Sequence, residues 1–298
     1  MLAHIDTRSA LVILLTLPLE KEYVNRSLRW KFLVRIFGAN KKNMLNLQKL
    51  RIDCIVIPKI IHYIWFGNIP YPPKVQHCIE SWKRIMPQYE FMLWNESTFD
   101  VNKTTFTQQA YSERKWAFVS DYVRIYALYK YGGWYLDTDV EIVKPLSPFE
   151  KNRVVLGTDD GGYLTALMGS EPEHPYWKEI LNYYESLRFI DNGALNMTVN
   201  NTYLQDVLYG YGYVVDNRLQ YLREGIVVYP DDYFHVASLT SGKLHRTSNT
   251  CAIHWHTLTW VSKKTKFVRF IRMHILCPIL GDRTYTKITS WLKKLWNK

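Results

Sequence analysis

A strand–helix–strand pattern in residues 60–94 constrains the fold of this chain most. Ile60–Phe66 (IIHYIWF) is an apolar run of the length of a buried strand, bounded by a proline and a glycine. Residues 73–86 have a helical pattern that opens on a proline pair and ends before the next proline. Residues 89–94 (YEFMLW) are typical of a second strand. This order predicts a βαβ unit and therefore an α/β fold with a parallel sheet.

The remaining segments fit the same fold class. Residues 110–131 are rich in apolar and aromatic side chains and predict one long helix, which a glycine pair ends. Further strands are expected at 134–137, 140–143, 153–157, 163–169, 225–229 and 251–256, and further helices near 174–188 and 201–209. No linker divides the middle of the chain. We therefore expect one domain over residues 52–260, with appendages at 1–51 and 261–298.

The basic charge of the chain lies in two flanks. The formal net charge is +11, which first suggests nucleic acid or an anionic membrane as a partner. Residues 21–51 carry +8 and residues 261–298 carry +9, whereas residues 52–260 carry −5. This distribution argues against a nucleic-acid groove across the main domain, so no nucleic-acid partner is expected.

The C-terminal flank predicts basic amphipathic helices that bear Trp and Phe, which suit an anionic membrane surface. Packing on the domain, or a solvated tail, is the alternative. The apolar run at residues 10–19 is too short to span a bilayer, which takes about 20 residues, and it lacks a signal-peptide pattern. Four cysteines without a CxxC pair fit free thiols in a reducing compartment. We expect a cytoplasmic protein, peripheral at the inner face of the plasma membrane.

The acidic turn Asp137-Thr138-Asp139 is the first candidate for chemistry. It lies between two predicted strands, at the carboxyl end of the first, where α/β folds place ligands. Two carboxylates at i and i+2 across a turn can face one Mg²⁺ or Mn²⁺ ion. Such an ion neutralises the charge that develops on a departing nucleotide diphosphate. A solvated acidic turn is the alternative for an isolated D-x-D, and the flanking strands favour the metal site.

Asp121 and Arg124 form the second candidate. They lie one turn apart on one helix face, within a stretch, residues 116–131, that is otherwise nearly all apolar or aromatic. A helix that is apolar on nearly every side is buried, and buried charges must be paired or bound to a ligand. A carboxylate can accept hydrogen bonds from sugar hydroxyls, and an arginine can bind hydroxyl or phosphate oxygens. A surface ion pair is the alternative.

With these residues in view, the chain resembles the glycosyltransferase family 32 group with a DxD motif, the sugar transferases of the bacterial polysaccharide type. It is also similar to the catalytic domain of the large clostridial glucosylating toxins. The resemblance implies a GT-A-like, Rossmann-type nucleotide-sugar-binding fold with a mostly parallel central sheet. The segments that carry it are IPKIIHYIWFG (57–67), IESWKRIMP (79–87), YEFMLWN (89–95), KWAFVSDYVRIYALYKYGGWYLDTDVEIVKPL (115–146) and SGKLHRTSNTCAIHWHTLTW (241–260).

The resemblance assigns roles to the acidic candidates. Asp139 would bind the metal directly, and Asp137 would contact metal-bound water or the ribose and sugar of the donor. Asp121 and Arg124 would hold the donor sugar, with Arg124 also near the phosphate. Mn²⁺ or Mg²⁺ and a nucleotide-sugar, with UDP-sugar favoured, are therefore the expected cofactor and donor.

Aromatic side chains and histidines complete the implied site. Trp65 would stack on the nucleotide base, and Trp260 would close over the diphosphate from a mobile loop. Alternation along a strand would put His254 and His256 on one face, where one of them could complete the metal or diphosphate shell. For Trp65 a place in the core, and for the histidines a structural role, is the alternative.

Residues 195–202 (LNMTVNNT) depart from the family pattern, which has a Gly-Pro-containing loop near the donor sugar. Asn196 and Thr198 are the remaining candidates there for contact with the sugar.

The implied reaction is metal-dependent transfer of a sugar to a hydroxyl of a glycan or lipid-linked glycan, with retention, in capsular, lipo- or exopolysaccharide synthesis. No nucleophile is evident, so attack from the face of the leaving group is expected. The alternatives are a toxin-like effector that glycosylates a protein, a nucleotide-sugar hydrolase and a non-enzymatic carbohydrate-binding protein.

Overall fold

The computed structural model describes residues 57–159, 162–238, 240–257 and 263–281, together with 284–285 and 287–288. The predicted appendage at residues 1–51, and Trp260, lie outside the described residues. Among the helices of the described part, none is both long enough and apolar enough to cross a bilayer.

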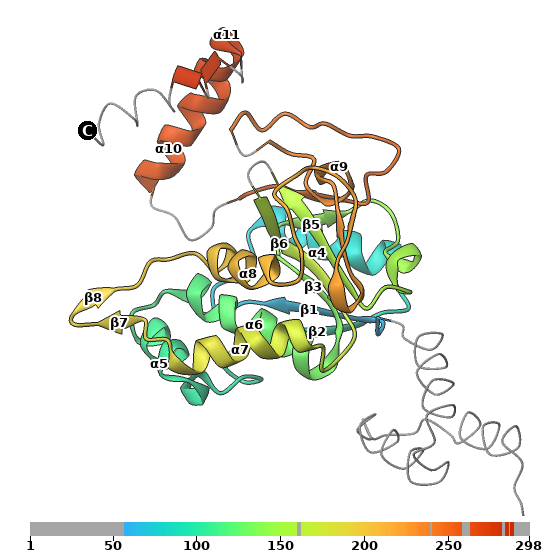
Figure 1. The fold of residues 1–298 in the computed structure, drawn as a ribbon. Helices are drawn as coiled ribbons and strands as arrows, with labels where there is room; N and C mark the ends of the chain where they lie inside the picture. The colour runs from blue at the N-terminus through green and yellow to red at the C-terminus, as the bar shows by residue number, and fades with distance from the viewer. Residues whose placement is uncertain are drawn as a thin grey trace, which may run out of the picture. The chain divides into compact units, whose positions relative to one another are not determined.

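A seven-stranded sheet forms the centre of the fold, in the order β2-β1-β3-β6-β5-β10-β9 (Figure 1). Its strands are β1 (Ile60–Ile64), β2 (Glu90–Trp94), β3 (Gly133–Leu136), β5 (Val154–Asp159), β6 (Gly162–Ser170), β9 (Gln220–Tyr221) and β10 (Ile226–Tyr229). β1 pairs in parallel with β2 and β3, and β10 with β5, whereas β6 and β9 run antiparallel to their neighbours. Five of the seven strands therefore share one direction, which confirms the expected α/β fold with a mostly parallel sheet.

The predicted βαβ unit is present. α4 (Pro73–Ile85) joins β1 to β2, and the two strands pair from Ile60 opposite Glu90 to Ile64 opposite Trp94. The helix begins at a proline because proline fixes φ near its helical value and lacks the N–H that the first turn leaves unpaired.

Helices and short strands cover both faces of the sheet. Tyr135 of β3 packs into one apolar cluster with α5, α6, α7 and α8, whereas Trp134 and Leu136 pack into another with α4, β4, β11 and α9. Because strands of this kind are buried on both faces, their sequences are continuously apolar rather than alternating. These further elements are α5 (Thr105–Ser112), α6 (Trp116–Tyr131), α7 (Pro175–Ser186), α8 (Asn200–Tyr209), α9 (Asp231–Phe234), β4 (Val140–Ile142) and β11 (Ala252–His254).

The remaining elements lie outside these layers. β7 (Ile190–Asp191) and β8 (Ala194–Leu195) form a separate hairpin, which Figure 1 shows at one end of the molecule. Near the C-terminus, α10 (Lys263–Ile271), a π-helical turn (Arg272–Leu276) and α11 (Cys277–Leu280) follow one another. Helices are thus present in the described part of the predicted C-terminal flank.

The prediction of one long helix over residues 110–131 is wrong. The chain forms α5 and α6 instead, and Arg114 between them takes a φ of 55°. α5 begins earlier than expected because Thr104 and Thr107 form a capping box at its start. No glycine or proline marks the break, so the last residues of α5 and the whole of α6 had the pattern of one helix.

α6 is attached to β1 at its C-terminal end. It ends at Gly132, as expected, where φ is 63° and a Cβ atom would lie 2.7 Å from the backbone nitrogen of Pro172. The ring Nε2 of His62 lies 2.8 Å from the carbonyl oxygen of Gly132, and the indole N–H of Trp94 donates to His62 Nδ1 over 3.2 Å. Burial lowers the pKa of His62 to about 4, so the ring stays neutral. This contact fixes the end of α6 to β1, which pairs with β3, the strand that leads to the acidic turn.

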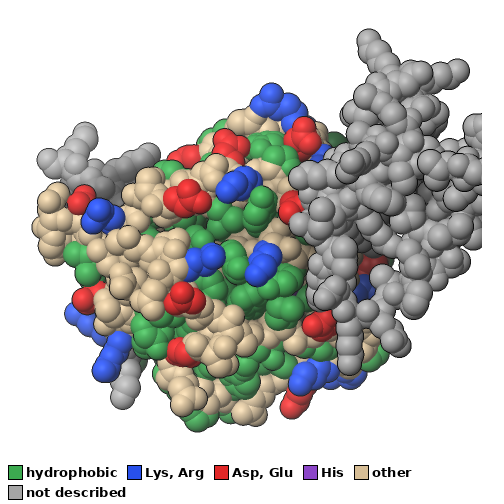
Figure 2. Space-filling view, turned by 90° about the horizontal axis from the view of Figure 1, so that it is seen from below, with side chains coloured by type: hydrophobic (Ala, Val, Ile, Leu, Met, Phe, Trp, Pro, Cys, Tyr) green, Lys and Arg blue, Asp and Glu red, His purple; other side chains and the backbone are tan. Residues whose placement is uncertain are grey.

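One face of the molecule is shown in Figure 2. Acidic and basic side chains are interspersed there among apolar ones.

Candidate active site at the Asp137–Asp139 turn

The acidic turn leaves the carboxyl end of β3, in the middle of the sheet. The backbone N–H of Asp137 donates to Ala166 of β6 over 2.8 Å, and the N–H of Val140 donates to the carbonyl oxygen of Asp137 over 2.9 Å. These bonds close the turn between β3 and β4. The structure therefore places Asp137 and Asp139 at the sheet edge where the sequence predicts them.

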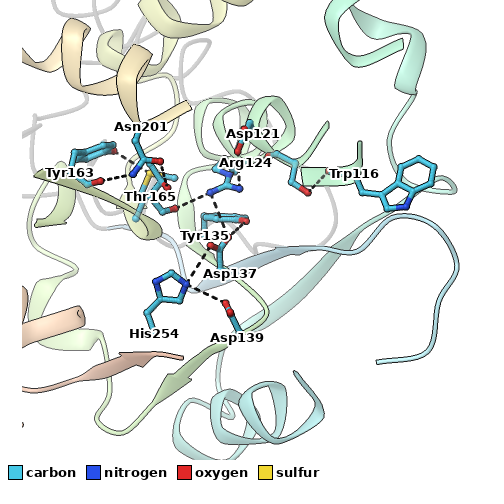
Figure 3. A network of polar contacts seen from close by, with 12 residues as sticks. Trp116, Asp121, Arg124, Tyr135, Asp137, Asp139, Tyr163, Thr165, Asn201 and His254 are labelled. Carbon is cyan, nitrogen blue, oxygen red and sulfur yellow. Dashed lines mark hydrogen bonds and ion pairs between the residues drawn. The ribbon is translucent and has the colours of Figure 1, made fainter. Parts of the chain in front are cut away.

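Arg124 of α6 links the helix to this turn (Figure 3). Its guanidinium nitrogens lie 3.0 Å from a carboxylate oxygen of Asp121 and 3.5 Å from one of Asp137. It also donates to the carbonyl oxygen of Thr165 over 3.2 Å and lies 4.7 Å from the ring centre of Tyr135. The Arg124 side chain is only 8% exposed, so this buried charge is paired on two sides, as burial requires.

The charges around Arg124 shift its pKa and that of its first partner. Burial raises the pKa of Asp121, and the nearby Arg124 guanidinium opposes this effect. Burial lowers the pKa of Arg124, but Tyr135, Asp137 and Asp121 outweigh it and hold that pKa above its usual value. The hydroxyl of Tyr135 donates to Asp137 over 2.5 Å and so holds this carboxylate beside the guanidinium.

The C-terminal strand brings a histidine to the other carboxylate. β11 pairs antiparallel with β4, and His254 Nε2 lies 3.4 Å from Asp139 and 4.0 Å from Asp137. The backbone N–H and the hydroxyl of Thr257 donate to Asp139 over 2.7 and 2.9 Å. Burial raises the pKa of Asp139, but His254 and Thr257 outweigh burial, so the pKa lies below its usual range. Asp139 is therefore held as a carboxylate.

His254 and His256 lie together, though not by strand alternation. β11 ends at His254, and His256 takes a φ of 50°, which no strand contains. The alternation argument is therefore wrong for His256. The bend nevertheless brings the two rings to 3.8 Å between their centres.

The residues at the turn fit a divalent cation. Asp137, Asp139 and His254 each offer one ligand atom, and these three atoms lie within 4.8 Å of one another. Carboxylate oxygens suit Mg²⁺ and Mn²⁺, and a single imidazole is compatible with the latter. The donor set therefore matches the metal expected from the sequence.

Trp65 lies near this group but outside its polar network. It directly follows β1, the neighbour of β3, at the same end of the sheet. Its indole N–H donates to the carbonyl oxygen of Ile69 over 2.6 Å, and its ring lies edge-on to Tyr71 at 5.1 Å. Its role in base stacking stays a prediction, as does the lid role of Trp260.

Asn201, and not Asn196 or Thr198, enters the network in the segment that departs from the family pattern. Asn201 donates to the carbonyl oxygen of Tyr163 over 2.8 Å and accepts from the Thr165 hydroxyl over 3.1 Å. Asn196 bonds instead to the Tyr203 hydroxyl and to the backbone N–H of Thr198. The sequence carried no signal for Asn201, because a polar residue in the first turn of a predicted helix most often serves the helix end.

Comparison with known proteins adds three findings. Residues 72–156 match the family model described as a glycosyltransferase sugar-binding region containing a DXD motif. The chain is 31% identical over 134 residues to inositol phosphoceramide mannosyltransferase 3 of Schizosaccharomyces pombe, covering 42% of this chain and 36% of that protein. It is 31% identical over 138 residues to mannosyl phosphorylinositol ceramide synthase CSH1 of Saccharomyces cerevisiae, covering 42% and 35%. The chain thus spans little more than a third of the length of these relatives.

Among solved structures, the PaToxG glycosyltransferase matches 57% of this chain and 77% of its own, with 18% identity and a TM-score of 0.39. The region matched by the family model contains Asp121, Arg124, Asp137 and Asp139, and in that region Asp137-Thr138-Asp139 is the only D-x-D sequence.

Proposed function

The chain carries a DXD-containing glycosyltransferase region, and from this premise we propose that it transfers a sugar from a nucleotide-sugar to a hydroxyl of a lipid or lipid-linked glycan. One observation carries the proposal. The Asp121–Arg124–Asp137 ion-pair chain, centred on the buried Arg124, meets the Asp139–His254 pair at the end of β3. This arrangement sets a buried guanidinium and a group of cation ligands around one turn, and a leaving diphosphate requires both.

Asp137, Asp139 and His254 would hold the Mn²⁺ or Mg²⁺ ion. When bound, the ion would neutralise negative charge on the leaving nucleotide diphosphate. Arg124 is held by Asp121 and by the Thr165 carbonyl, so its charge is in place before the reaction begins. Asp121 keeps further lone pairs that can accept hydrogen bonds from sugar hydroxyls.

We propose attack from the face of the leaving group, with retention, because the carboxylates around the turn are already paired. Asp121 is paired with Arg124, and Asp139 with His254 and Thr257, so neither is placed as a free nucleophile. The acceptor oxygen would bond to the anomeric carbon as the bond from that carbon to the phosphate oxygen breaks. The acceptor proton would pass to the departing phosphate oxygen.

An assay of donors tests this function. The full chain, with Mn²⁺, is incubated with UDP- and GDP-sugars, with and without lipid-linked glycan and inositol-phosphoceramide acceptors. We expect nucleotide release from one donor, labelled sugar in the acceptor, and loss of both after chelation of the metal. Equal release without any acceptor would identify a hydrolase, and no release from any donor would contradict the proposal.

The C-terminal helices support a lipid acceptor and a place at an anionic membrane, at the inner face of the plasma membrane. Arg269 of α10 donates to the carbonyl oxygen of His256, and Cys277 contacts the carbonyl oxygen of Thr240 over 3.8 Å. Through these two contacts the C-terminal helices pack beside the candidate site. The large apolar side chains that these helices expose are Phe267, Val268, Phe270, Ile275, Leu276, Ile279 and Leu280.

Replacing Phe267 and Phe270 together by serine should weaken binding to phosphatidylserine-containing vesicles by at least tenfold. Both rings are more than half exposed, and burying one Phe side chain is worth about 1.5–3 kcal/mol. Co-sedimentation measures the change. The matched control is the double change Tyr221→Ser and Val214→Ser, which removes two exposed apolar side chains of another part of the surface. Equal binding by both double variants, or no binding by the unchanged chain, would contradict the membrane surface.

A further inference from the structure

Three buried or nearly buried histidines lie together beside the acidic turn. His235 follows α9, His254 ends β11, and His256 lies two residues further on. Their ring centres are 3.8 Å apart for His254 and His256, 4.8 Å for His235 and His256, and 6.0 Å for His235 and His254. One ring nitrogen of each lies within 4.8 Å of the other two. His235 was not among the residues predicted from the sequence, and all three lie outside the region matched by the family model.

Two ring nitrogens of this cluster have no hydrogen-bond partner among the described residues. They are Nδ1 of His254 and Nε2 of His256, and both atoms are buried. The His256 residue is 8% exposed. A buried polar atom is costly unless it is hydrogen-bonded or bound to a ligand. Two such atoms on rings in contact therefore indicate a ligand that bridges the rings.

The other nitrogen of His254 already has the partner that a metal-bound histidine requires. Its Nε2 lies 3.4 Å from Asp139, and Thr257 fixes that carboxylate with two hydrogen bonds. In metal sites the ligating histidine donates its second ring N–H to a carboxylate, which sets the tautomer and the ring orientation. With the proton on Nε2, the lone pair of His254 is on Nδ1, the nitrogen that lacks a partner.

We propose that His235, His254 and His256 form a second cation site, for a borderline transition-metal ion such as Zn²⁺. Zn²⁺ binds well to imidazole nitrogens, whereas Mg²⁺ and Mn²⁺ bind better to carboxylate oxygens such as those of the turn. A three-histidine site leaves a fourth position of a tetrahedral ion for water or another ligand. His254 belongs to both groups, but a neutral ring that donates its Nε2–H to Asp139 binds only one ion, through Nδ1. With the second site occupied, Asp137 and Asp139 alone would hold the ion at the turn. The inference concerns binding of the ion alone and does not depend on the proposed sugar transfer.

The test is titration of Zn²⁺ into the metal-free full chain, followed by calorimetry. We expect one ion per chain at this site. His235→Gln and His256→Gln should each lower the Zn²⁺ affinity at least 100-fold. This loss exceeds the roughly 10–100-fold loss typical when the mutated residue only hydrogen-bonds to a metal ligand. His245→Gln, at an exposed histidine of the same region, is the matched control and should bind as the unchanged chain does. Asp137→Asn alters the carboxylate group but should retain the ion.

Unaltered Zn²⁺ affinity in both histidine variants, or no Zn²⁺ binding by the unchanged chain, would overturn the proposal. Circular dichroism without metal shows whether each variant is folded. Co²⁺ provides a second measurement that needs no variant, because the ion reports its geometry through visible absorption. Intense absorption typical of a tetrahedral ion is expected, and the weak spectrum of a six-coordinate, oxygen-rich site would overturn the three-histidine site.

Discussion

Replacing Asp139 by asparagine should lower the rate of sugar transfer by about 10²–10³-fold, the usual cost of losing one group that stabilises charge in the transition state. Asparagine keeps the size of the side chain and an oxygen that can accept from the backbone N–H and hydroxyl of Thr257. It removes the negative charge that faces His254 and the proposed cation. The turn should therefore stay folded while the metal is held more weakly.

Glu141→Gln is the matched control for this change. Glu141 lies two residues further on, in β4, where it accepts from the indole N–H of Trp255 over 2.9 Å and lies 3.3 Å from His77. Initial rates of nucleotide release with acceptor, and Mn²⁺ affinity, measure the effect, and thermal unfolding measures the fold. We expect near-normal rates from Glu141→Gln. A folded Asp139→Asn protein with a near-normal rate would contradict the metal role of Asp139.

The fold of the βαβ unit could be predicted because its signals are local. An apolar run, a proline pair and a second apolar run specify β1, α4 and β2 within 35 residues of sequence. The break between α5 and α6 could not be predicted, because Arg114 takes its left-handed φ without a glycine or proline nearby. The capping box at Thr104 is a local signal for the start of α5 only and does not mark where that helix ends.

Some residues of the candidate site could likewise be predicted from the sequence, and others could not. Asp121 and Arg124 could be predicted as a pair shielded from solvent, because a helix that is apolar on nearly all sides is buried in the fold. The DXD glycosyltransferase resemblance rests on contiguous segments, and the family model matches the part of them within residues 72–156. Thr257 could not be predicted, because β11 reaches β4 from more than 100 residues away and this pairing brings Thr257 to the turn. His235 could not be predicted either, because it follows α9 and meets the rings of His254 and His256 only in the folded chain.

Replacing Arg124 should have the second large effect, on the free energy of unfolding as well as on the rate of sugar transfer. Its removal in Arg124→Ala leaves Asp121 and Asp137 without their shared counter-charge. Removing one partner of a buried ion pair costs about 3–5 kcal/mol in the free energy of unfolding. Arg124→Lys keeps one positive charge, but a single ammonium lacks the planar fork that meets two carboxylates and the Thr165 carbonyl at once. We expect Arg124→Lys to be folded and to transfer sugar about 100-fold more slowly or worse.

Arg153→Lys separates the loss of an ion pair from the loss of a catalytic group. Arg153 also meets two carboxylates, Glu171 at 2.7 Å and Glu224 at 2.8 Å, but it precedes β5 and so lies at the amino end of a strand parallel to β3. It is therefore at the opposite edge of the sheet from the acidic turn. Arg153→Lys should lower the melting temperature without changing the transfer rate of the folded protein, whereas Arg124→Lys should lower the rate even where the protein is fully folded. Equal rates in the two lysine variants would show that Arg124 only stabilises the fold, because the charge at the end of β3 would then have no part in the departure of the diphosphate.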